Sequence, residues 1–198
     1  GIIDIGADAA DRAGNPGLVP PHELDELVER MHRNSQGQSR KATGAAASNL
    51  DLYQVNCTFY DALARNDAAY LIARAIQFFV PGIPQVYYVG LLAGENDIEL
   101  LEKTKVGRDI NRHYYSRQEV LANMQKPVVQ KLIELIRLRN SHPAFEGTFK
   151  VDAVSAEVLC LAWHAEPAER VTLRVNLQDK TAVVEYTLGG GLHTLRID

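Results

Sequence analysis

The stretch IPQVYYVG, Ile83–Gly90, decides the fold class. It is a continuous run of apolar, β-branched and aromatic residues of strand length, which is typical of a parallel strand covered on both faces. The residues before it, 67–79, are almost entirely apolar and predict a buried helix that ends at Pro81-Gly82. A helix, a buried strand, a long polar loop and another helix form a unit of an α/β barrel or of a doubly wound sheet. In both folds, ligands bind at the carboxyl ends of the strands.

Local patterns predict the remaining helices. Asn66 or Asp67 can cap the buried helix, and Ser116 with Glu119 forms a capping box that begins another one. Two amphipathic helices are predicted, one after Pro20-Pro21 and one from Pro127 to about residues 140–143. Their apolar faces are Leu24, Leu27, Val28 and Met31 in the first helix, and Val128, Leu132, Leu135 and Ile136 in the second.

The pattern changes to that of an antiparallel sheet after Phe145. The stretch RVTLRVNL, residues 170–177, alternates apolar and polar side chains, which is typical of a half-buried strand. The stretches EVLCLAW, 157–163, and AVVEYTL, 182–188, resemble its neighbours. A boundary near residues 143–150, followed by a small β domain in which Trp163 belongs to the core, is therefore predicted.

Composition excludes several classes of function. The net charge is −4, the pI is about 5.9, and no Lys/Arg-rich run is present, so nothing favours a nucleic-acid partner. No apolar run reaches the ~20 residues that a membrane helix needs. Cys57 and Cys160 lie far apart among apolar neighbours, which predicts buried free thiols and a reducing cytoplasm. No histidine or cysteine spacing indicates a metal, and no nucleotide-binding motif indicates a cofactor. His22, His32, His142 and His164 are interpreted as surface or turn residues.

The stretch VGRDINRHYYSRQEV, Val106–Val120, is unusually dense in hydrogen-bonding groups and has no apolar periodicity. Two interpretations stand. Arg108, Asp109 and Arg112 could pair with each other in a solvated loop, as many surface ions do. Alternatively, Arg108 and its neighbours make directed hydrogen bonds to a polar ligand at the end of the preceding strand.

A second candidate segment is NLDLYQVN, Asn49–Asn56. Its alternation also suits an ordinary strand or extended edge. It follows a Gly-, Ala- and Ser-rich loop, residues 36–48, and loops of this composition often belong to sites. The two interpretations remain open at this point.

Three segments together resemble the sucrose phosphorylases, which belong to the α-amylase superfamily of retaining (β/α)8-barrel enzymes. They are AASNLDLYQVN (46–56), PGIPQVYYVGLLAGENDIELLEKT (81–104) and GRDINRHYY (107–115), and LIRLRNSHPAF (135–145) is similar to the last barrel helix of the superfamily. The resemblance implies an α/β fold: the last helix–strand–helix section of a (β/α)8 barrel with an inserted subdomain, followed by an antiparallel β domain. The implied domains are 1–64 for the subdomain after the seventh strand, 65–143 for the end of the catalytic barrel and 144–198 for the β domain.

The resemblance also implies a reaction in which sucrose and phosphate give α-glucose 1-phosphate and fructose by double displacement. The nucleophile, the acid/base and the transition-state stabiliser are expected upstream of Gly1, so no catalytic residue is expected on this chain, and the chain alone is predicted to be inactive. Arg108 matches the arginine that hydrogen-bonds the glucosyl hydroxyls, and Asp109, Asn111 and Arg112 would support it. The segment Asp51, Leu52, Tyr53 and Gln54 matches a mobile loop on the acceptor side.

Several alternatives stay open beside this reading. Related enzymes phosphorolyse glucosylglycerate, glucosylglycerol or sucrose 6-phosphate, although Tyr53 favours sucrose. A non-catalytic carbohydrate-binding or scaffolding module is the alternative outside the enzyme class. Because members of the family form dimers, a homodimer is compatible with the resemblance. No metal, cofactor, nucleic-acid partner or membrane contact is implied.

Overall fold

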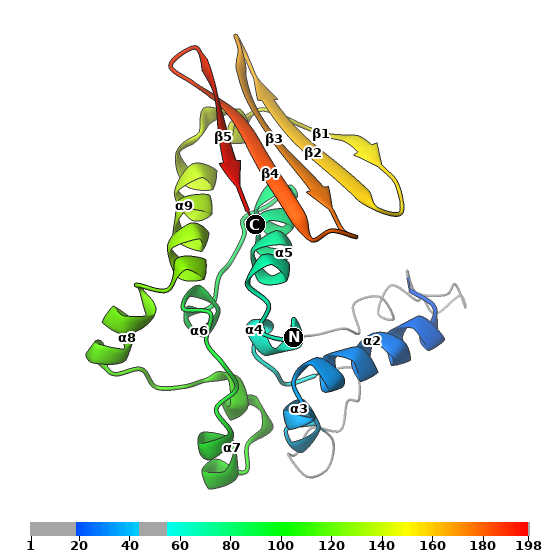
Figure 1. Ribbon diagram of the computed structural model, residues 1–198, viewed down its shortest axis with the longest axis vertical. Helices are drawn as coiled ribbons and strands as arrows, with labels where there is room; N and C mark the ends of the chain where they lie inside the picture. The colour runs from blue at the N-terminus through cyan, green and yellow to red at the C-terminus, as the bar shows by residue number, and fades with distance from the viewer. Residues whose placement is uncertain (1–18, 44–54, 198) are drawn as a thin grey trace. The chain divides into compact units, whose positions relative to one another are not determined.

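The structure, a computed structural model, describes residues 19–43 and 55–197 (Figure 1). The side chains of Pro21, Ala153 and Val154 are outside this description. The chain forms two compact units, Gly1–Arg65 with Tyr87–Val120 and Asn66–Val86 with Leu121–Asp198. The division into 1–64, 65–143 and 144–198 stays a prediction.

The first unit consists of short helices joined by loops. Its helices are α2 (Pro21–Asn34), α3 (Gln38–Lys41), α4 (Phe59–Ala62), α6 (Tyr88–Leu91), α7 (Ile98–Thr104), the 3-10 helix η2 (Gly107–Asn111) and the start of α8 (Arg117–Asn123). The amphipathic helix predicted after Pro20-Pro21 is confirmed as α2, with Leu24 and Val28 buried, whereas Leu27 is 44% exposed. Small apolar clusters hold these helices together, one around Val28 and Cys57, the other around Leu101 and Ile110.

The second unit contains the helices α5 and α9, the short 3-10 helix η3 and a five-stranded sheet. The elements are α5 (Asp67–Phe79), α9 (Pro127–Ser141), η3 (Pro143–Glu146), β1 (Thr148–Val154), β2 (Val158–Ala165), β3 (Glu169–Asn176), β4 (Thr181–Leu188) and β5 (Gly191–Arg196). The sheet is an antiparallel meander with the strands in sequence order. The helices predicted at 67–79 and after Pro127 are thus confirmed, as are the strands predicted after Phe145.

The core of the second unit follows the predicted alternation. Val171, Leu173 and Val175 are fully buried, while Leu177 lies past the end of β3 and is 49% exposed. Trp163 is buried, as predicted, and its indole nitrogen donates a 2.6 Å hydrogen bond to the carbonyl of Phe79 at the end of α5. This bond satisfies the indole N–H, which would otherwise be buried without an acceptor.

The predicted strand at Ile83–Gly90 is wrong in this structure. Residues 83–87 belong to no regular element, and α6 begins at Tyr88. Ile83 is 92% exposed and Tyr87 is 54% exposed. A strand needs a neighbour to accept and donate its backbone hydrogen bonds. Because the only sheet among the described residues is the antiparallel β1–β5 meander, this apolar segment has no strand to pair with there.

Two predictions about single side chains have different outcomes. Cys57 and Cys160 are free and buried, as predicted. The interpretation of the histidines as surface or turn residues is wrong for His32, which lies in α2 and is 5% exposed. His142 connects α9 to η3, as expected for a turn residue, although it is only 6% exposed. His32 pairs with the Ser39 hydroxyl at 2.6 Å, and Nε2 of His142 lies 2.6 Å from the Thr187 carbonyl. Both rings are buried because these polar partners replace water.

Candidate functional site

Arg108 lies on η2, a short 3-10 helix whose inner side is anchored in the apolar core of the first unit. Gly107 and Ile110, three residues apart, are buried, and Ile110 packs with Ala42 and Leu101. Residues three apart share one side of a 3-10 helix, so the next position, Arg108, faces away from this core. Its side chain is exposed. The backbone of η2 is therefore fixed while the guanidinium remains available to a ligand.

The neighbours of Arg108 contact protein groups rather than solvent alone. Asp109 and Arg112 form an ion pair at 3.8 Å. The side-chain amide of Asn111 donates to the Cys57 carbonyl at 3.4 Å, which joins η2 to the segment before α4. These contacts agree with a supporting role for the three residues, and that role stays a prediction.

His113 connects two carboxylates beyond the end of η2. Its Nδ1 lies 2.6 Å from Oδ2 of Asp97, and its Nε2 lies 3.2 Å from Oε1 of Glu119. Burial alone would lower the pKa of His113, but the hydrogen bonds to Asp97 and Glu119 outweigh it and raise the pKa above its ordinary value. The ring is therefore favoured in its charged form.

Two tyrosines, Tyr115 and Tyr88, contact His113. Tyr115 meets it edge-on at 4.5 Å between centroids, and the Tyr88 hydroxyl donates to the His113 carbonyl at 2.9 Å. Partial burial, with the Tyr87 hydroxyl nearby, raises the pKa of Tyr88 to about 12, so this donor keeps its proton at neutral pH. Gly94 makes room for the arrangement, because a Cβ at that position would lie 2.1 Å from the Tyr115 hydroxyl.

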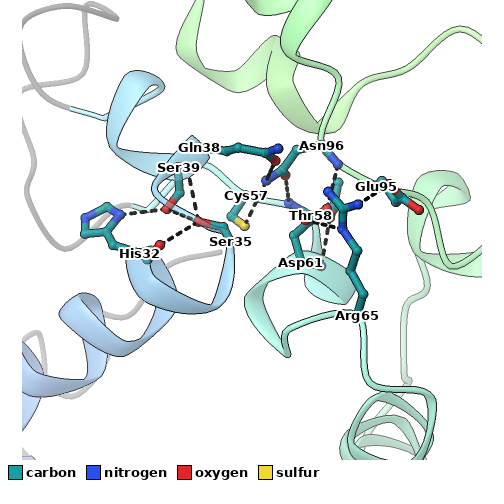
Figure 2. A network of polar contacts seen from close by, with 10 residues as sticks. All are labelled: His32, Ser35, Gln38, Ser39, Cys57, Thr58, Asp61, Arg65, Glu95 and Asn96. Atoms are coloured by element: carbon teal, nitrogen blue, oxygen red, sulfur yellow. Dashed lines mark hydrogen bonds and ion pairs between the residues drawn. The ribbon is translucent and has the colours of Figure 1, made fainter.

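A second polar network, shown in Figure 2, lies beside this segment in the same unit. Asp61, 1% exposed, accepts hydrogen bonds from the Thr58 hydroxyl at 2.9 Å, the Arg65 guanidinium at 2.7 Å and the backbone N–H of Asn96 at 2.7 Å. Asn96 in turn accepts from the backbone N–H of Thr58 at 2.8 Å. A buried carboxylate with three donors is fully satisfied and holds these segments in one geometry.

The network continues through Cys57 to the turn between α2 and α3. The amide of Asn96 lies 3.6 Å from Sγ of Cys57, and the hydroxyls of Ser35 and Ser39 are 2.7 Å apart. Burial is the main reason why the pKa of Cys57 is raised to about 11. Such a thiol remains protonated at neutral pH and acts as a packed side chain rather than a nucleophile.

The candidate residues are only partly covered by the structure. Arg108 is exposed, as a ligand-binding role requires. Asp51, Leu52, Tyr53 and Gln54 lie outside the described residues. Sequence reasoning missed Asp61 and Asp97. A signal existed for the first of them, because Thr58 and Asp61 have the spacing of a helix cap in which a hydroxyl precedes an acid by three residues.

The described part of the chain places no group of three His, Cys, Asp or Glu side chains where they could hold a metal ion. Within the same residues, no helix has the length and apolar character needed to cross a membrane.

Comparison with known proteins gives a consistent result, although no family model matches the chain. The sucrose phosphorylase of Agrobacterium vitis is 63% identical over 164 residues, which are 83% of this chain and 33% of that protein. The glucosylglycerol phosphorylase of Marinobacter adhaerens is 46% identical over 173 residues, 86% of this chain and 36% of that protein.

A solved structure is similar as well. The crystal structure of sucrose 6F-phosphate phosphorylase from Thermoanaerobacter thermosaccharolyticum matches with a TM-score of 0.80 and 40% identity, over 94% of this chain and 37% of that one. The chain thus spans about one third of the length of the relatives that it matches. It is homologous to the C-terminal portion of the sucrose phosphorylases and related glucosyl phosphorylases, which belong to the α-amylase family.

Proposed function

We propose that this chain forms the sugar-binding side of a retaining glucosyl phosphorylase that converts sucrose and phosphate to α-glucose 1-phosphate and fructose. The observation that carries the proposal is the 63% identity to a sucrose phosphorylase, which is above the 50% identity to a relative named for sucrose 6(F)-phosphate and the 46% identity to one named for glucosylglycerol. The exposed guanidinium of Arg108 on a fixed turn supports it. We further propose a cytoplasmic location, in keeping with two free buried thiols.

The chemistry assigns different tasks to different parts of the enzyme. In a retaining mechanism a carboxylate attacks the anomeric carbon while a carboxylic acid protonates the leaving oxygen. Phosphate then attacks the anomeric carbon of the glucosyl-enzyme and releases the carboxylate. We place those carboxyl groups outside this sequence. The task left to Arg108 is to donate two directed hydrogen bonds to neighbouring hydroxyls of the glucosyl group, for which a planar guanidinium is suited. Positioning of this kind can contribute several kcal/mol to the lowering of the barrier.

The acceptor side is assigned to the segment Asp51–Gln54. One site must hold neutral fructose first and dianionic phosphate second. A fixed carboxylate suits fructose but repels phosphate, since two unit charges about 4 Å apart interact by about 4 kcal/mol at an effective dielectric of 20. Asp51 is therefore proposed to face fructose in one state and Tyr53 to donate to phosphate in the other, with Leu52 and Gln54 belonging to the same acceptor segment.

Related acceptors give the alternative within the same class of enzyme. Relatives at 50% and 46% identity are named for sucrose 6(F)-phosphate and for glucosylglycerol. A non-catalytic carbohydrate-binding module is the alternative outside that class. Glucosylglycerate, glucosylglycerol and sucrose 6-phosphate are therefore included in the assay beside sucrose.

The test uses a chimera in which this chain replaces the matching residues of the Agrobacterium vitis sucrose phosphorylase. We expect the chimera to release glucose 1-phosphate from sucrose faster than from the other three donors, and the isolated chain to release none. Arg108→Lys should lower kcat/KM by an amount that corresponds to about 2–4 kcal/mol of lost transition-state stabilisation, because the two parallel charged hydrogen bonds of the guanidinium are lost.

Arg33→Lys, an exposed arginine on α2, is the matched control and should leave kcat/KM unchanged. A folded chimera that prefers one of the other donors would overturn the assignment of sucrose. Full activity of Arg108→Lys would return Arg108 to the interpretation as a solvated loop residue.

A further inference from the structure

Asp97 forms hydrogen bonds with three different parts of the segment that surrounds Arg108. Its backbone N–H donates to the Ile110 carbonyl of η2 at 2.7 Å. Its Oδ1 accepts from the Leu100 N–H at 2.8 Å and caps α7. Its Oδ2 pairs with Nδ1 of His113 at 2.6 Å. Asp97 therefore joins η2, the start of α7 and His113.

Glu119 has the corresponding role at the start of α8. Its Oε2 accepts from the backbone N–H of Ser116 at 2.7 Å, and the Ser116 hydroxyl accepts from the Glu119 N–H at 3.2 Å, which completes a capping box. Its Oε1 is left for Nε2 of His113, 3.2 Å away. Each carboxylate thus uses one oxygen for a helix cap and the other for the same imidazole ring.

The protonation state of the ring follows from these partners. An ionised carboxylate only accepts hydrogen bonds, so both ring nitrogens must donate, and only the imidazolium has two N–H groups. The charged and titratable groups that face the ring are Asp97 and Glu119, with Tyr115 against its edge and Tyr88 bonded to its backbone carbonyl. The pKa of His113 is accordingly raised, although its partial burial acts in the opposite direction.

We propose that His113 is a positioning residue for Arg108: its two ring nitrogens join the N-terminal caps of α7 and α8 and so close the segment that carries Arg108. This inference rests on the sugar-binding role proposed for Arg108. When the ring is neutral, one carboxylate faces a lone pair instead of a donor, and that link opens. The segment 107–116 is then held at Ile110 and through only one of the two ring nitrogens of His113, so the guanidinium is less well aimed.

The first test is made in the chimera with His113→Gln, whose neutral amide donates from a single nitrogen and cannot take the place of both Nδ1 and Nε2. We expect kcat/KM for phosphorolysis of sucrose to fall roughly 10- to 100-fold, the effect of misplacing a binding group by about 1 Å. His22→Gln, an exposed histidine on α2, is the matched control and should show no change. Thermal melting of each variant reports whether it is folded.

A double mutant separates action through Arg108 from a general loss of structure. If His113 acts by aiming Arg108, then His113→Gln should have little further effect once Arg108→Lys has been made. Additive losses in the double mutant would overturn the proposal. If Arg108→Lys alone left kcat/KM unchanged, the function proposed for Arg108 would be refuted instead. Failure of the inference about His113 and failure of the proposed function can thus be told apart.

The pH profile gives a readout that a purely structural role would not move. His113 is hydrogen-bonded to both carboxylates only when its ring is protonated. The value of kcat/KM should therefore be high below the raised pKa of His113 and fall as the pH rises through it. Glu119→Gln keeps an oxygen for the Ser116 cap and turns an NH2 group toward Nε2. This NH2 group can donate to the lone pair of a neutral ring, so α8 stays joined to His113 at high pH. The fall in kcat/KM should therefore be reduced or absent in Glu119→Gln, and it should also disappear in His113→Gln.

An equal fall in kcat/KM at the same pH in the unsubstituted chimera and in Glu119→Gln would overturn the proposal. If His113→Gln melts below the assay temperature, Glu119→Gln provides the decisive result by itself, because it changes the partner of Nε2 while keeping the cap of α8.

Discussion

Oδ2 of Asp61 lies 2.7 Å from the backbone nitrogen of Asn96, although the two residues are 35 positions apart. The same carboxyl accepts from the hydroxyl of Thr58, the residue that caps α4, and pairs with Arg65. One buried carboxylate thereby ties α4 to the residues that lead into α7, where Asp97 follows at once.

The first prediction concerns this carboxylate. Asp61→Asn replaces one acceptor oxygen by an NH2 group, which then faces N–H and O–H donors inside the protein. Since a buried donor without an acceptor is costly, we expect the free energy of unfolding to fall by about 2–4 kcal/mol. Urea unfolding of the chimera measures it. Glu102→Gln breaks an exposed pair with Lys41 and should cost less than about 1 kcal/mol. Equal effects of the two substitutions would contradict the role given to Asp61.

A second prediction concerns the thiol of Cys57. Because burial raises the pKa of Cys57 to about 11, the thiol stays almost wholly protonated at pH 8, and the side chain is also buried. Alkylation under native conditions should therefore be much slower than alkylation of an exposed cysteine introduced as Ala156→Cys, and the difference should vanish in denaturant. Mass spectrometry of timed samples follows both sites. Rapid native labelling of Cys57 would show that its surroundings open readily.

The third prediction concerns Gly147, which precedes β1. A Cβ there would lie 1.9 Å from the His164 carbonyl oxygen and 2.9 Å from Cα of Ala165, and these backbone atoms belong to β2 and cannot rotate away. Gly147→Ala should lower the free energy of unfolding by about 1–3 kcal/mol or more. Gly191→Ala is the control, because its Cβ would meet no atom closer than 3.6 Å. Its free energy of unfolding should stay within about 0.5 kcal/mol of that of the unsubstituted chimera. A stable Gly147→Ala chimera would mean that β1 and β2 can separate without loss.

Local patterns predicted the parts of the structure that depend on neighbouring residues. The Ser116–Glu119 capping box and the Asn66 cap of α5 are both present, because the atoms that form them lie within three positions of each other. The alternation in β3 likewise predicted its buried side, since a pleated strand turns successive side chains to opposite faces.

Features with distant partners were predicted less well. His32 and His142 are buried because Ser39 and Thr187 happen to face them, and no pattern around either histidine shows this. The network at Asp61 depends on Asn96 in the same way. Ile83–Gly90 has the composition of a buried strand, but composition does not supply the neighbouring strand that would pair with it. Arg108 could be singled out by the density of polar groups, whereas its link to His113 required the geometry of Asp97.

The hydrogen bond from Trp163 to the carbonyl of Phe79 has a consequence for the way this protein can be divided. Phe145 lies against both rings, with centroid separations of 5.3 Å to Phe79 and 5.9 Å to Trp163, and the Arg139 guanidinium of α9 stacks 4.5 Å from the Phe145 ring. The end of α5, the last turns of α9 and strand β2 therefore share one aromatic junction. A deletion or an exchange of modules made between α9 and β1 would cut through it and leave the Phe79 carbonyl without its donor. In recombination between relatives, the sheet and these two helices should accordingly be inherited together, as a single block.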